Sequence, residues 1–567
     1  MTNLAKAGEL FVSALQAQQN RDYRSAERLY LEALALAPDR PSVLNNLATV
    51  LLSAGKAAQS LPFIRRLLQA DGSNPDAWTL LGNAELSCGN SDGALQAFDH
   101  AMSLKPDHPV TLANRANALN ALGRHDEALA SVQQALRLAP GLAEALVTRG
   151  NTLVDLHRPA QAVDSYRAAL AEDPENPRTL ANLGNALLET GRVAESLACC
   201  EHALALDPGN PHAEMNRGNA LRDLGRHEEA LCSYRRAQQL SPQLSEAWWN
   251  ESLCRLMLCD WEQGWRHYGR RWQIPGPLQG RPPLKAAQWD GSPVNGTLLV
   301  WAEQGVGDQI LFLTMLDDLR TRCRSLMVAA DRRLLPLLQR TWKDVDFRPV
   351  EELLRLDGYS AQAALGDLGQ YLRTKPPDFD GRAGTATLSP DRERARGLRA
   401  RLCPDPRSVL CGLSWRSTNP RIGLHKSLAP ETLLHALPKD HVRFVDLQYG
   451  DTAAERAELQ RRHGITLQHC DEIDNFNDLD GLAALIEACD VVISVSNTTV
   501  HLAGALGKPT LVLLPSALGR IWYWHHQGER SLWYPSCRML RQQQAGDWAP
   551  LVAQAAAEVK KIIELKQ

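Results

Sequence analysis

The sequence has no long apolar run and no marked excess of charge of either sign. It holds no stretch of about 18 uninterrupted apolar residues, so we expect no membrane-spanning helix and no integral membrane association. The N-terminal residues MTNLAKAGELFVSALQAQQNRDY lack the basic start and apolar core of a secretory signal, which predicts a cytoplasmic location. A net charge of -3 over 567 residues gives no reason to expect nucleic acid as a partner.

Cysteine is sparse and shows no pairing motif. The chain has 12 cysteines and no C-x-x-C sequence, which argues against both a zinc site and a disulfide framework. We therefore expect the thiols to be reduced and mostly buried. D-x-D strings occur, but in a chain with 65 acidic residues they give no sign of a metal site, and we predict neither a metal nor a cofactor.

What the sequence does contain is an internal period of 34 residues. Proline recurs on this grid, with Gly72 in the one position that lacks it, at Pro38, Pro106, Pro140, Pro174, Pro208 and Pro242. Glycine recurs at the same spacing, at Gly55, Gly89, Gly123, Gly191 and Gly225. Segments such as RHDEALASVQQALRL follow these glycines, and their apolar residues have helical spacing. The pattern predicts repeated helix–turn–helix units.

This part of the chain resembles the tetratricopeptide repeat family, most clearly in NPRTLANLGNALLETGRVAESLACCEHALALDP. The resemblance covers about residues 7–276, as eight units of which the last, WWNESLCRLMLCDWEQGWRHYGRRW, is degenerate. It implies an α-solenoid over residues 1–276 in which the first helix of each unit lines the concave surface.

Asparagine recurs at two positions of the first helix, three residues apart and therefore on one face. The first position, interrupted by Leu80 and Thr148, holds Asn46, Asn114, Asn182, Asn216 and Asn250. The second position holds Asn83, Asn117, Asn151, Asn185 and Asn219. Asparagine costs roughly 0.5 kcal/mol relative to alanine inside a helix, so its repetition indicates a use.

Two uses fit these amides. They can form a ladder that donates to and accepts from the backbone of an extended polypeptide, or they can cross-link neighbouring repeats. The first position resembles the peptide-binding asparagines in the repeats of O-GlcNAc transferases, which implies a polypeptide as partner. The acceptor-binding candidates are Asn114, Asn117, Asn151, Asn182, Asn185, Asn216, Asn219 and Asn250.

A segment rich in proline and glycine, residues 277–293, precedes two blocks of alternating strands and helices, residues 294–400 and 401–567. The first block predicts strands at TLLVWAEQ and SLMVAA, helices at QILFLTMLDDL and RRLLPLLQRTW, and then an irregular stretch to about residue 395. The second predicts strands at SVLCGLSW, HVRFVDLQ, DVVISVS and PTLVLLP, the helix AAERAELQRR and a C-terminal helix. This alternation predicts two parallel α/β halves with a ligand cleft between them.

Three loops after strands of the second half carry candidate donor-binding residues. The segment after DVVISVS begins a helix with Ser496, Asn497, Thr498, Thr499 and His501, a cluster that suits a diphosphate, although ordinary N-capping explains one of these residues. The loop SWRSTNPRIGLHKSL supplies Arg416, Arg421 and Lys426, whose charge either offsets a leaving phosphate or is simply solvated. In DLQYGD, Gln448 and Tyr449 suit an amide contact and stacking on a base, and aromatic packing is an equal alternative.

Residues 289–550 resemble the two-domain GT-B glycosyltransferases, and among them family 9, the heptosyltransferases. The matching motifs are WDGSP (289–293), EQGVGD (303–308), LQYGD (447–451) and NTTVHLAGALGKP (497–509). The resemblance implies that the second half binds a nucleotide-sugar, for which UDP is our first choice, and that the first half faces the acceptor. Ser496 stands where family 9 often has an acid, which puts the nucleotide and sugar in doubt more than the fold.

Asp308 is the candidate catalytic residue. It corresponds to the acid of the heptosyltransferase L-G-D motif, and the resemblance implies that it acts as a base on the acceptor hydroxyl. The alternatives are an acid that only stabilises a helix N-terminus, with Glu303 or a histidine such as His425 as the base.

The sequence therefore predicts an inverting, metal-independent glycosyltransferase that moves a sugar from a nucleotide-diphosphate sugar to a polypeptide held by the repeats. Two alternatives stay open. One is a repeat scaffold whose α/β domain binds a nucleotide-sugar without turnover, and the other is a transferase with a glycan or lipid-linked acceptor.

Overall fold

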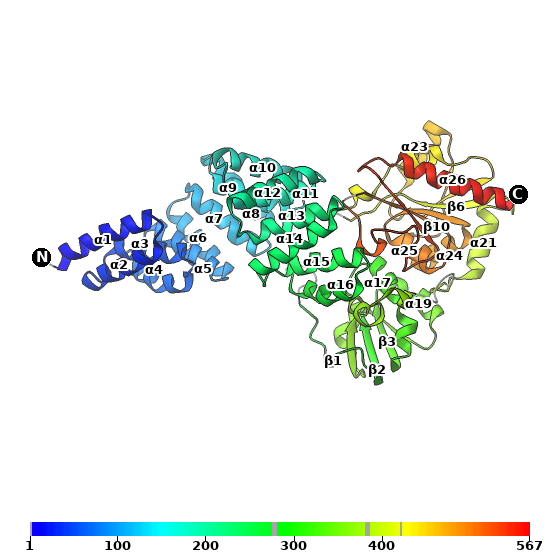
Figure 1. The fold of residues 1–567 in the computed structure, drawn as a ribbon, viewed down its shortest axis with the longest axis horizontal. Coiled ribbons are helices and arrows are strands. Elements are labelled where there is room, and N and C mark those ends of the chain that lie inside the picture. The colour runs from blue at the N-terminus through cyan, green and yellow to red at the C-terminus, as the bar shows by residue number, and fades with distance from the viewer. Residues whose placement is uncertain (1–2, 275–279, 380–385, 420–421, 517) are drawn as a thin grey trace. The chain divides into compact units, whose positions relative to one another are not determined.

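The computed structural model describes residues 3–274, 280–379, 386–419, 422–516 and 518–567 (Figure 1). The chain forms two compact units, of which the first comprises Met1–Thr190 with Ala198–Pro208 and the second Gly191–Leu197 with Gly209–Gln567. The second unit thus contains both the last repeats and the whole α/β region. Among the described helices, none combines the length and the apolar character that crossing a membrane requires.

Residues 3–268 form helix pairs at the predicted 34-residue spacing. The helices are α1 (Asn3–Gln19), α2 (Tyr23–Leu36), α3 (Pro41–Ser53), α4 (Ala57–Ala70), α5 (Pro75–Ser87), α6 (Ser91–Leu104), α7 (Pro109–Ala121), α8 (His125–Leu138), α9 (Ala143–Asp155), α10 (Pro159–Glu172), α11 (Pro177–Glu189), α12 (Val193–Leu206), α13 (Pro211–Asp223), α14 (His227–Leu240), α15 (Ser245–Met257) and α16 (Trp261–Tyr268). The helical repeats predicted from the period are confirmed.

The turn inside each pair requires a left-handed residue. The five glycines of the grid have φ between 73° and 82°, a region that costs other residues roughly 1–2 kcal/mol. Arg21, His157 and Cys259 occupy the same grid position in the remaining pairs and also have positive φ, of 59°, 58° and 63°. The packing of the two helices therefore imposes the left-handed conformation at this position, and glycine is the residue that adopts it at the lowest free-energy cost.

A second glycine position lets the helices of a pair approach closely. A Cβ atom added to Gly82 would lie 2.4 Å from Phe98 of the following helix, and one added to Gly150 would lie 2.4 Å from Tyr166. A Cβ at Gly218 would likewise lie 2.6 Å from Tyr234. The aromatic ring of the second helix thus occupies the space that the missing side chain of the first helix leaves.

The first α/β half is built on a five-stranded parallel sheet of order β1-β5-β2-β3-β4. Its strands are β1 (Ala287–Gln288), β2 (Val294–Trp301), β3 (Cys323–Ala330), β4 (Asp346–Pro349) and β5 (Ala361–Ala364). Its helices are α17 (Val306–Leu313), α18 (Leu316–Arg320), α19 (Leu335–Thr341) and α20 (Gly369–Leu372). Helix α21 (Arg392–Leu402) follows in the chain and packs against α24 (Leu479–Ala488) of the second half.

The second half has a six-stranded parallel sheet of order β11-β10-β9-β6-β7-β8. Its strands are β6 (Val409–Ser414), β7 (Val442–Asp446), β8 (Leu467–Gln468), β9 (Val491–Val495), β10 (Thr510–Leu514) and β11 (Cys537–Arg541). Its helices are α22 (Pro430–Ala436), α23 (Ala453–His463), α24 (Leu479–Ala488), α25 (Thr498–Ala505) and α26 (Ala549–Lys566). Every residue of β6, β9 and β10 is buried, as expected for central strands that are covered on both faces.

Two details of the first half differ from the sequence prediction. The stretch expected to be irregular contains β4 and β5, whose sequences DFRP and AQAA lack the apolar, β-branched character by which strands are recognised. The segment expected to be a linker contributes β1, which pairs with β5. Both strands are short and gain their hydrogen bonds from neighbours in the sheet, so local sequence carries little sign of them.

The last repeat packs directly against the α/β region. The indole Nε1 of Trp265 donates to the carbonyl oxygen of Arg373 at 2.7 Å, and its ring meets that of Trp522 edge-on with centroids 5.5 Å apart. Trp265 and Trp261 are both buried in the same core as the first sheet. Helices α15 and α16 are thus part of the α/β core as well as the end of the repeat array.

Candidate functional site

Both sheets have a point at which the strand order reverses. From β6, the chain builds β7 and β8 on one side and β9, β10 and β11 on the other, so the reversal lies between β6 and β9. In the first sheet it lies between β2 and β5. Ligands of open parallel sheets bind at the carboxyl ends of the strands at such points.

The loops that follow β2, β6 and β9 line one cavity of about 520 Å³. Its polar lining includes Gln304, Asp308, Ser417, Thr418, Asn419, Lys426, Tyr449, Ser496, Asn497, Thr498, His501 and Tyr523. The structure thus brings together the predicted catalytic residue and six of the nine predicted donor-binding residues. These six are Lys426, Tyr449, Ser496, Asn497, Thr498 and His501.

Asp308 lies in the first turn of α17, which begins after the N-cap residue Gly305. Burial raises the pKa of its carboxyl group to about 6, and the negative charge of Glu303 contributes in the same direction. Lys426 and the backbone N–H groups of Asp308 and Gly305 oppose the shift. A carboxyl group with this pKa is mostly ionised at neutral pH and is well matched to accepting a proton there.

The second glycine of the G-x-G-D loop has a packing role. A Cβ atom on Gly307 would lie 2.9 Å from the His501 ring, so the glycine lets α17 approach α25. Helix α17 belongs to the first half and α25 to the second, and the contact sets Asp308 opposite the loop after β9. This glycine-rich loop therefore joins the two halves of the α/β region.

Glu303, the alternative base, does not line the cavity. Its side chain is buried, accepts from the guanidinium of Arg271 at 2.9 Å and accepts from the backbone N–H of Gly366 at 3.1 Å. Arg271 also pairs with Asp367 at 2.8 Å. These contacts commit Glu303 to holding the loop after β2 against the loop after β5.

Lys426 is a buried cation that has no partner among the residues that the structure describes. Only 4% of the residue is exposed, yet among the described residues its ammonium group makes no hydrogen bond or ion pair within 4.0 Å. Burial lowers its pKa to about 8, and Asp308 is the charge that opposes this shift. Burying a charge without a partner is costly, so Lys426 is suited to pairing with an anion.

The loop after β9 is held by its own hydrogen bonds. Asn497 is the N-cap of α25, and its amide donates to Ser414 Oγ at 2.7 Å and to the carbonyl oxygen of Arg416 at 3.1 Å. The Ser496 hydroxyl accepts from Trp524 Nε1 at 2.8 Å. Thr499 donates to the carbonyl oxygen of Leu447 at 3.2 Å and does not line the cavity. The Thr498 hydroxyl also lines the cavity, makes no hydrogen bond to another described residue and can therefore bind a ligand.

His501 is an uncharged structural residue of the cavity wall. Its Nδ1 lies 3.1 Å from the Tyr534 hydroxyl and its Nε2 lies 3.2 Å from the Tyr523 hydroxyl. Burial lowers its pKa to about 3, and the Lys426 charge adds to the shift. Both ring nitrogens are occupied, so His501 is unsuited to act as a base.

Besides Thr499, two predicted donor-binding residues, Gln448 and Arg416, do not face the cavity. The Gln448 side-chain oxygen accepts from the backbone N–H groups of Trp415 and Arg416, at 3.0 and 2.9 Å. The Arg416 guanidinium pairs with Glu455 at 2.5 Å and lines a different pocket. Arg421 lies outside the described residues. Tyr449 does line the cavity, and its hydroxyl accepts from the backbone N–H of Thr418 at 3.1 Å.

The asparagines of the repeats divide into two groups. Asn151 accepts from Tyr166 at 2.7 Å and from Asn182 of the next repeat at 3.2 Å, while Asn219 accepts from Tyr234 at 2.9 Å. Asn216 is only 5% exposed. The bond between Asn182 and Asn151 is a cross-link between neighbouring repeats, as the alternative interpretation expects, whereas the bonds to Tyr166 and Tyr234 join the two helices of one repeat. Asn114, Asn117, Asn185 and Asn250 have no hydrogen bond to another described residue, and for them peptide binding stays a prediction.

Sequence reasoning missed the contribution of the last repeat. Trp249 and Leu253 of α15 and Tyr268 of α16 line the cavity, together with Ile521, Trp522 and Tyr523 from the loop after β10. The 34-residue period could have indicated this contribution, because Leu253 occupies the position at which five earlier repeats have asparagine. Trp522 and Tyr523 of the loop after β10 both pack in the core and line the site.

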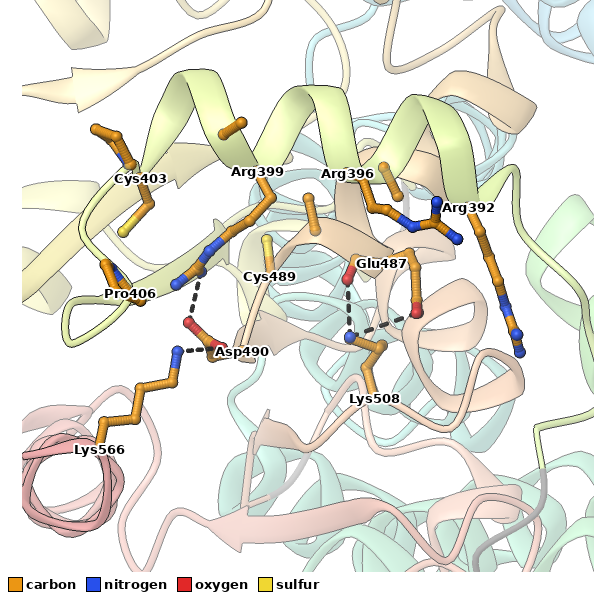
Figure 2. A pocket seen from close by; sticks show the side chains of 14 residues that line it. Arg392, Arg396, Arg399, Cys403, Pro406, Glu487, Cys489, Asp490, Lys508 and Lys566 are labelled. Carbon is orange, nitrogen blue, oxygen red and sulfur yellow. Dashed lines mark hydrogen bonds and ion pairs between the residues drawn. The ribbon is translucent and has the colours of Figure 1, made fainter.

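A second cavity, of about 510 Å³, lies at the opposite ends of the same strands and differs in its charges (Figure 2). Figure 2 shows Arg399 and Lys566 converging on Asp490, each at 2.6 Å, and Lys508 beside Glu487 at 3.4 Å. Both carboxylates of this cavity are thus paired with cations. Within the described residues, no three His, Cys, Asp or Glu side chains gather as metal ligands.

Comparisons with known proteins identify the repeats. Residues 4–140 match one tetratricopeptide repeat model, and residues 147–211 and 201–245 match another. The protein FlbA of Caulobacter vibrioides is 32% identical over 323 residues, which are 53% of this chain and 52% of that protein. The chain thus spans about half the length of the curated relative that it matches.

Solved structures of low similarity were also found. The structure of the APC/C hetero-tetramer Cut9-Hcn1 aligns with a TM-score of 0.40 and 18% identity over 48% of this chain and 52% of that one. YrrB, described as a TPR protein with an unusual peptide-binding site, aligns with a TM-score of 0.27 and 20% identity over 32% of this chain and 95% of that one. On the family matches and the helix pairs, residues 4–140 and 147–245 are tetratricopeptide repeats.

Proposed function

We propose that the chain is a GT-B glycosyltransferase that binds a nucleotide-diphosphate sugar in the cavity between its α/β halves and transfers the sugar to a polypeptide. The observation that carries the proposal is Lys426, a buried ammonium group that has no partner in the described part of the chain and lies in a cavity at the strand reversal of the second sheet. A diphosphate supplies the missing anion. Thr498 and the N-terminus of α25 line the same cavity and add donors.

In this proposal the first half supplies the base. The Asp308 carboxylate takes the proton of an acceptor hydroxyl as the hydroxyl oxygen forms a bond to the anomeric carbon of the sugar. The bond from that carbon to the diphosphate breaks, and the electron pair leaves with the diphosphate. Lys426 then offsets the charge that develops on the leaving group. Attack from the side opposite to the leaving group inverts the configuration of the sugar.

Asp308 and Lys426 suit these roles because each is close to its point of titration. With pKa values of about 6 and about 8, both are mostly charged at pH 7, although the buried environment disfavours each charge. A shifted pKa in a cleft is a usual mark of a functional site. The repeats favour a polypeptide acceptor, since arrays of this kind present extended binding surfaces.

Calorimetric titration of the full-length chain with UDP, dTDP, GDP and ADP tests the proposal. We expect at least one nucleotide to bind the wild-type chain and to bind Lys426→Met much more weakly. Lys439→Met is the matched control, because Lys439 is also a partly buried lysine with a lowered pKa but lies just before β7, away from the cavity. The absence of binding by all four nucleotides would remove the enzyme proposal. Nucleotide binding without turnover on any acceptor would favour the scaffold alternative.

A further inference from the structure

The last repeat departs from the others at the position that faces the cavity. The second asparagine series runs through Asn185 and Asn219 at 34-residue intervals, and the next member is Leu253. Leu253 and Trp249, one helical turn earlier on α15, both line the cavity. Each is half-buried: one side packs on the core of the α/β region, and the other faces the cavity.

This apolar surface belongs to the Asp308 side of the cavity. The Trp249 ring lies 4.8 Å from that of Tyr268, centroid to centroid, and the Tyr268 hydroxyl accepts from Gln304 Nε2 at 3.3 Å. Gln304 belongs to the loop that leads into Asp308. Lys426 and Thr498, which suit the diphosphate, come from the second half. The apolar patch is thus tied to the proposed base.

The repeat before it places a free amide donor on the equivalent face. Asn219 of α13 accepts from the Tyr234 hydroxyl through its side-chain oxygen, and its amide N–H₂ group has no bond to another described residue. Helices α13 and α15 are in contact, and Asn219 and Leu253 occupy equivalent positions on them. A backbone that accepts a hydrogen bond from Asn219 therefore comes next to Leu253.

We infer that Trp249 and Leu253 are positioning residues that select acceptors with an aliphatic side chain beside the modified hydroxyl. The inference rests on the proposed function and specifies its substrate class: a polypeptide segment in which a serine or threonine is flanked by an aliphatic residue. The aliphatic side chain packs on Trp249 and Leu253, which keeps the neighbouring hydroxyl at Asp308 and excludes water from that wall of the cavity.

Binding of two short fluorescein-labelled peptides to the UDP-saturated, full-length chain tests this selection by fluorescence anisotropy. The peptides share one central serine and differ only in its neighbours, Leu-Ser-Leu in one and Gln-Ser-Gln in the other. Burying aliphatic side chains against the patch predicts about tenfold tighter binding of the leucine peptide to the wild-type chain. The variant Leu253→Asn, which restores the asparagine of the other repeats, and Trp249→Ala should both bring the ratio of the two affinities close to one.

Conservative variants separate positioning from simple support of the fold. Trp249→Phe and Leu253→Met should keep most of the preference, because they retain an apolar surface. Leu138→Asn is the matched control, a leucine that is 44% exposed in another repeat, and it should leave the ratio unchanged. UDP affinity and thermal stability are measured on every variant.

Each result has one consequence. Equal affinities of the wild-type chain for the two peptides, no binding of either peptide, or a preference that survives Leu253→Asn and Trp249→Ala in folded protein would overturn the inference. If UDP still binds in those cases, the proposed function stands. Failure of the wild-type chain to bind any of UDP, dTDP, GDP and ADP counts against the proposed function itself.

Discussion

The two cavities at opposite ends of the second sheet use charge in opposite ways. At the amino ends of the strands, Asp490 is surrounded by Arg399 and Lys566 and accepts from the backbone N–H of Leu410 at 2.7 Å, so its charge is compensated (Figure 2). At the carboxyl ends, Lys426 is buried and Asp308 is partly buried, and neither has an ion-pair partner within 4.0 Å among the described residues. The first arrangement stabilises the fold, and the second keeps charge available for a ligand.

The pKa values express the same difference. The positive charges and the Leu410 N–H lower the pKa of Asp490 despite its burial, whereas burial raises that of Asp308. A carboxyl group with a lowered folded-state pKa adds stability above its unfolded-state value, and one with a raised pKa subtracts it. Removing the charge at the two positions should therefore change stability in opposite directions.

The largest expected effect is on turnover by Asp308→Asn. The amide keeps the shape of the carboxylate but cannot accept the proton, so kcat should fall roughly 10²- to 10⁴-fold with donor affinity nearly unchanged. The melting temperature at pH 7 should rise, because a buried charge is removed. Asp357→Asn, at an exposed position of the same half, is the control. Near-normal kcat on a verified acceptor would exclude Asp308 as the base.

The next effect is on nucleotide binding by Lys426→Met. Loss of a charged donor to a phosphate should weaken UDP binding by about 10- to 100-fold. The variant should be more stable than the wild-type chain at pH 7. Its folded-state pKa of about 8 lies below the ordinary value of 10.5, so this gain should diminish at more alkaline pH. Unchanged UDP affinity, measured by calorimetry, would show that the cation does not contact the diphosphate.

The paired cavity should respond to Asp490→Asn with a loss of stability. Two cations and a backbone N–H lose their shared carboxylate, and we expect the free energy of unfolding to fall by about 2 kcal/mol in urea titrations. UDP affinity should be unchanged. The control is Asp471→Asn, whose side chain is 97% exposed. A gain in stability would show that the pairing in this cavity does not offset its burial.

Titration with pH sharpens the contrast. The stability advantage of Asp308→Asn over the wild-type chain should be full above about pH 6 and should vanish below pH 3.8, where Asp308 is protonated in both folded and unfolded chains. Over the same interval, kcat/KM of the wild-type chain should decline as the pH falls. Thermal melts and initial rates across this range provide the measurements. A stability difference that grows towards acid pH would contradict the raised pKa.

The smallest effect concerns the turns of the repeats. His157 has a φ of 58° at a grid position where other repeats have glycine. His157→Gly removes the cost of the left-handed conformation but frees the unfolded backbone, so we expect a net gain of roughly 0.5 kcal/mol. Differential scanning calorimetry of the variant measures this gain. A loss of stability would mean that the His157 side chain makes a contribution that outweighs the strain.

The repeats were predictable in nearly every detail because their contacts are local in sequence. Each aromatic residue such as Tyr166 packs on a glycine 16 residues earlier, Gly150, so one period of sequence contains both partners. The central strands β6, β9 and β10 were equally predictable from the sequence, because strands that are buried on both faces consist of continuous apolar runs. The short strands β4 and β5 were missed because their partners are distant and their sequences polar or small.

For the candidate site, the sequence by itself determined which loops carry polar residues, and its candidates Asp308, Lys426 and Thr498 line one cavity in the structure. Only the tertiary structure decided which partners these side chains have. Gln448 accepts from the backbone of Trp415 and Arg416, and the Arg416 guanidinium pairs with Glu455. Leu253 of the last repeat lines the cavity. The physical reason is that a residue type and its spacing specify what a side chain can bond to, whereas its partner depends on which distant segments the packed core brings within about 3 Å.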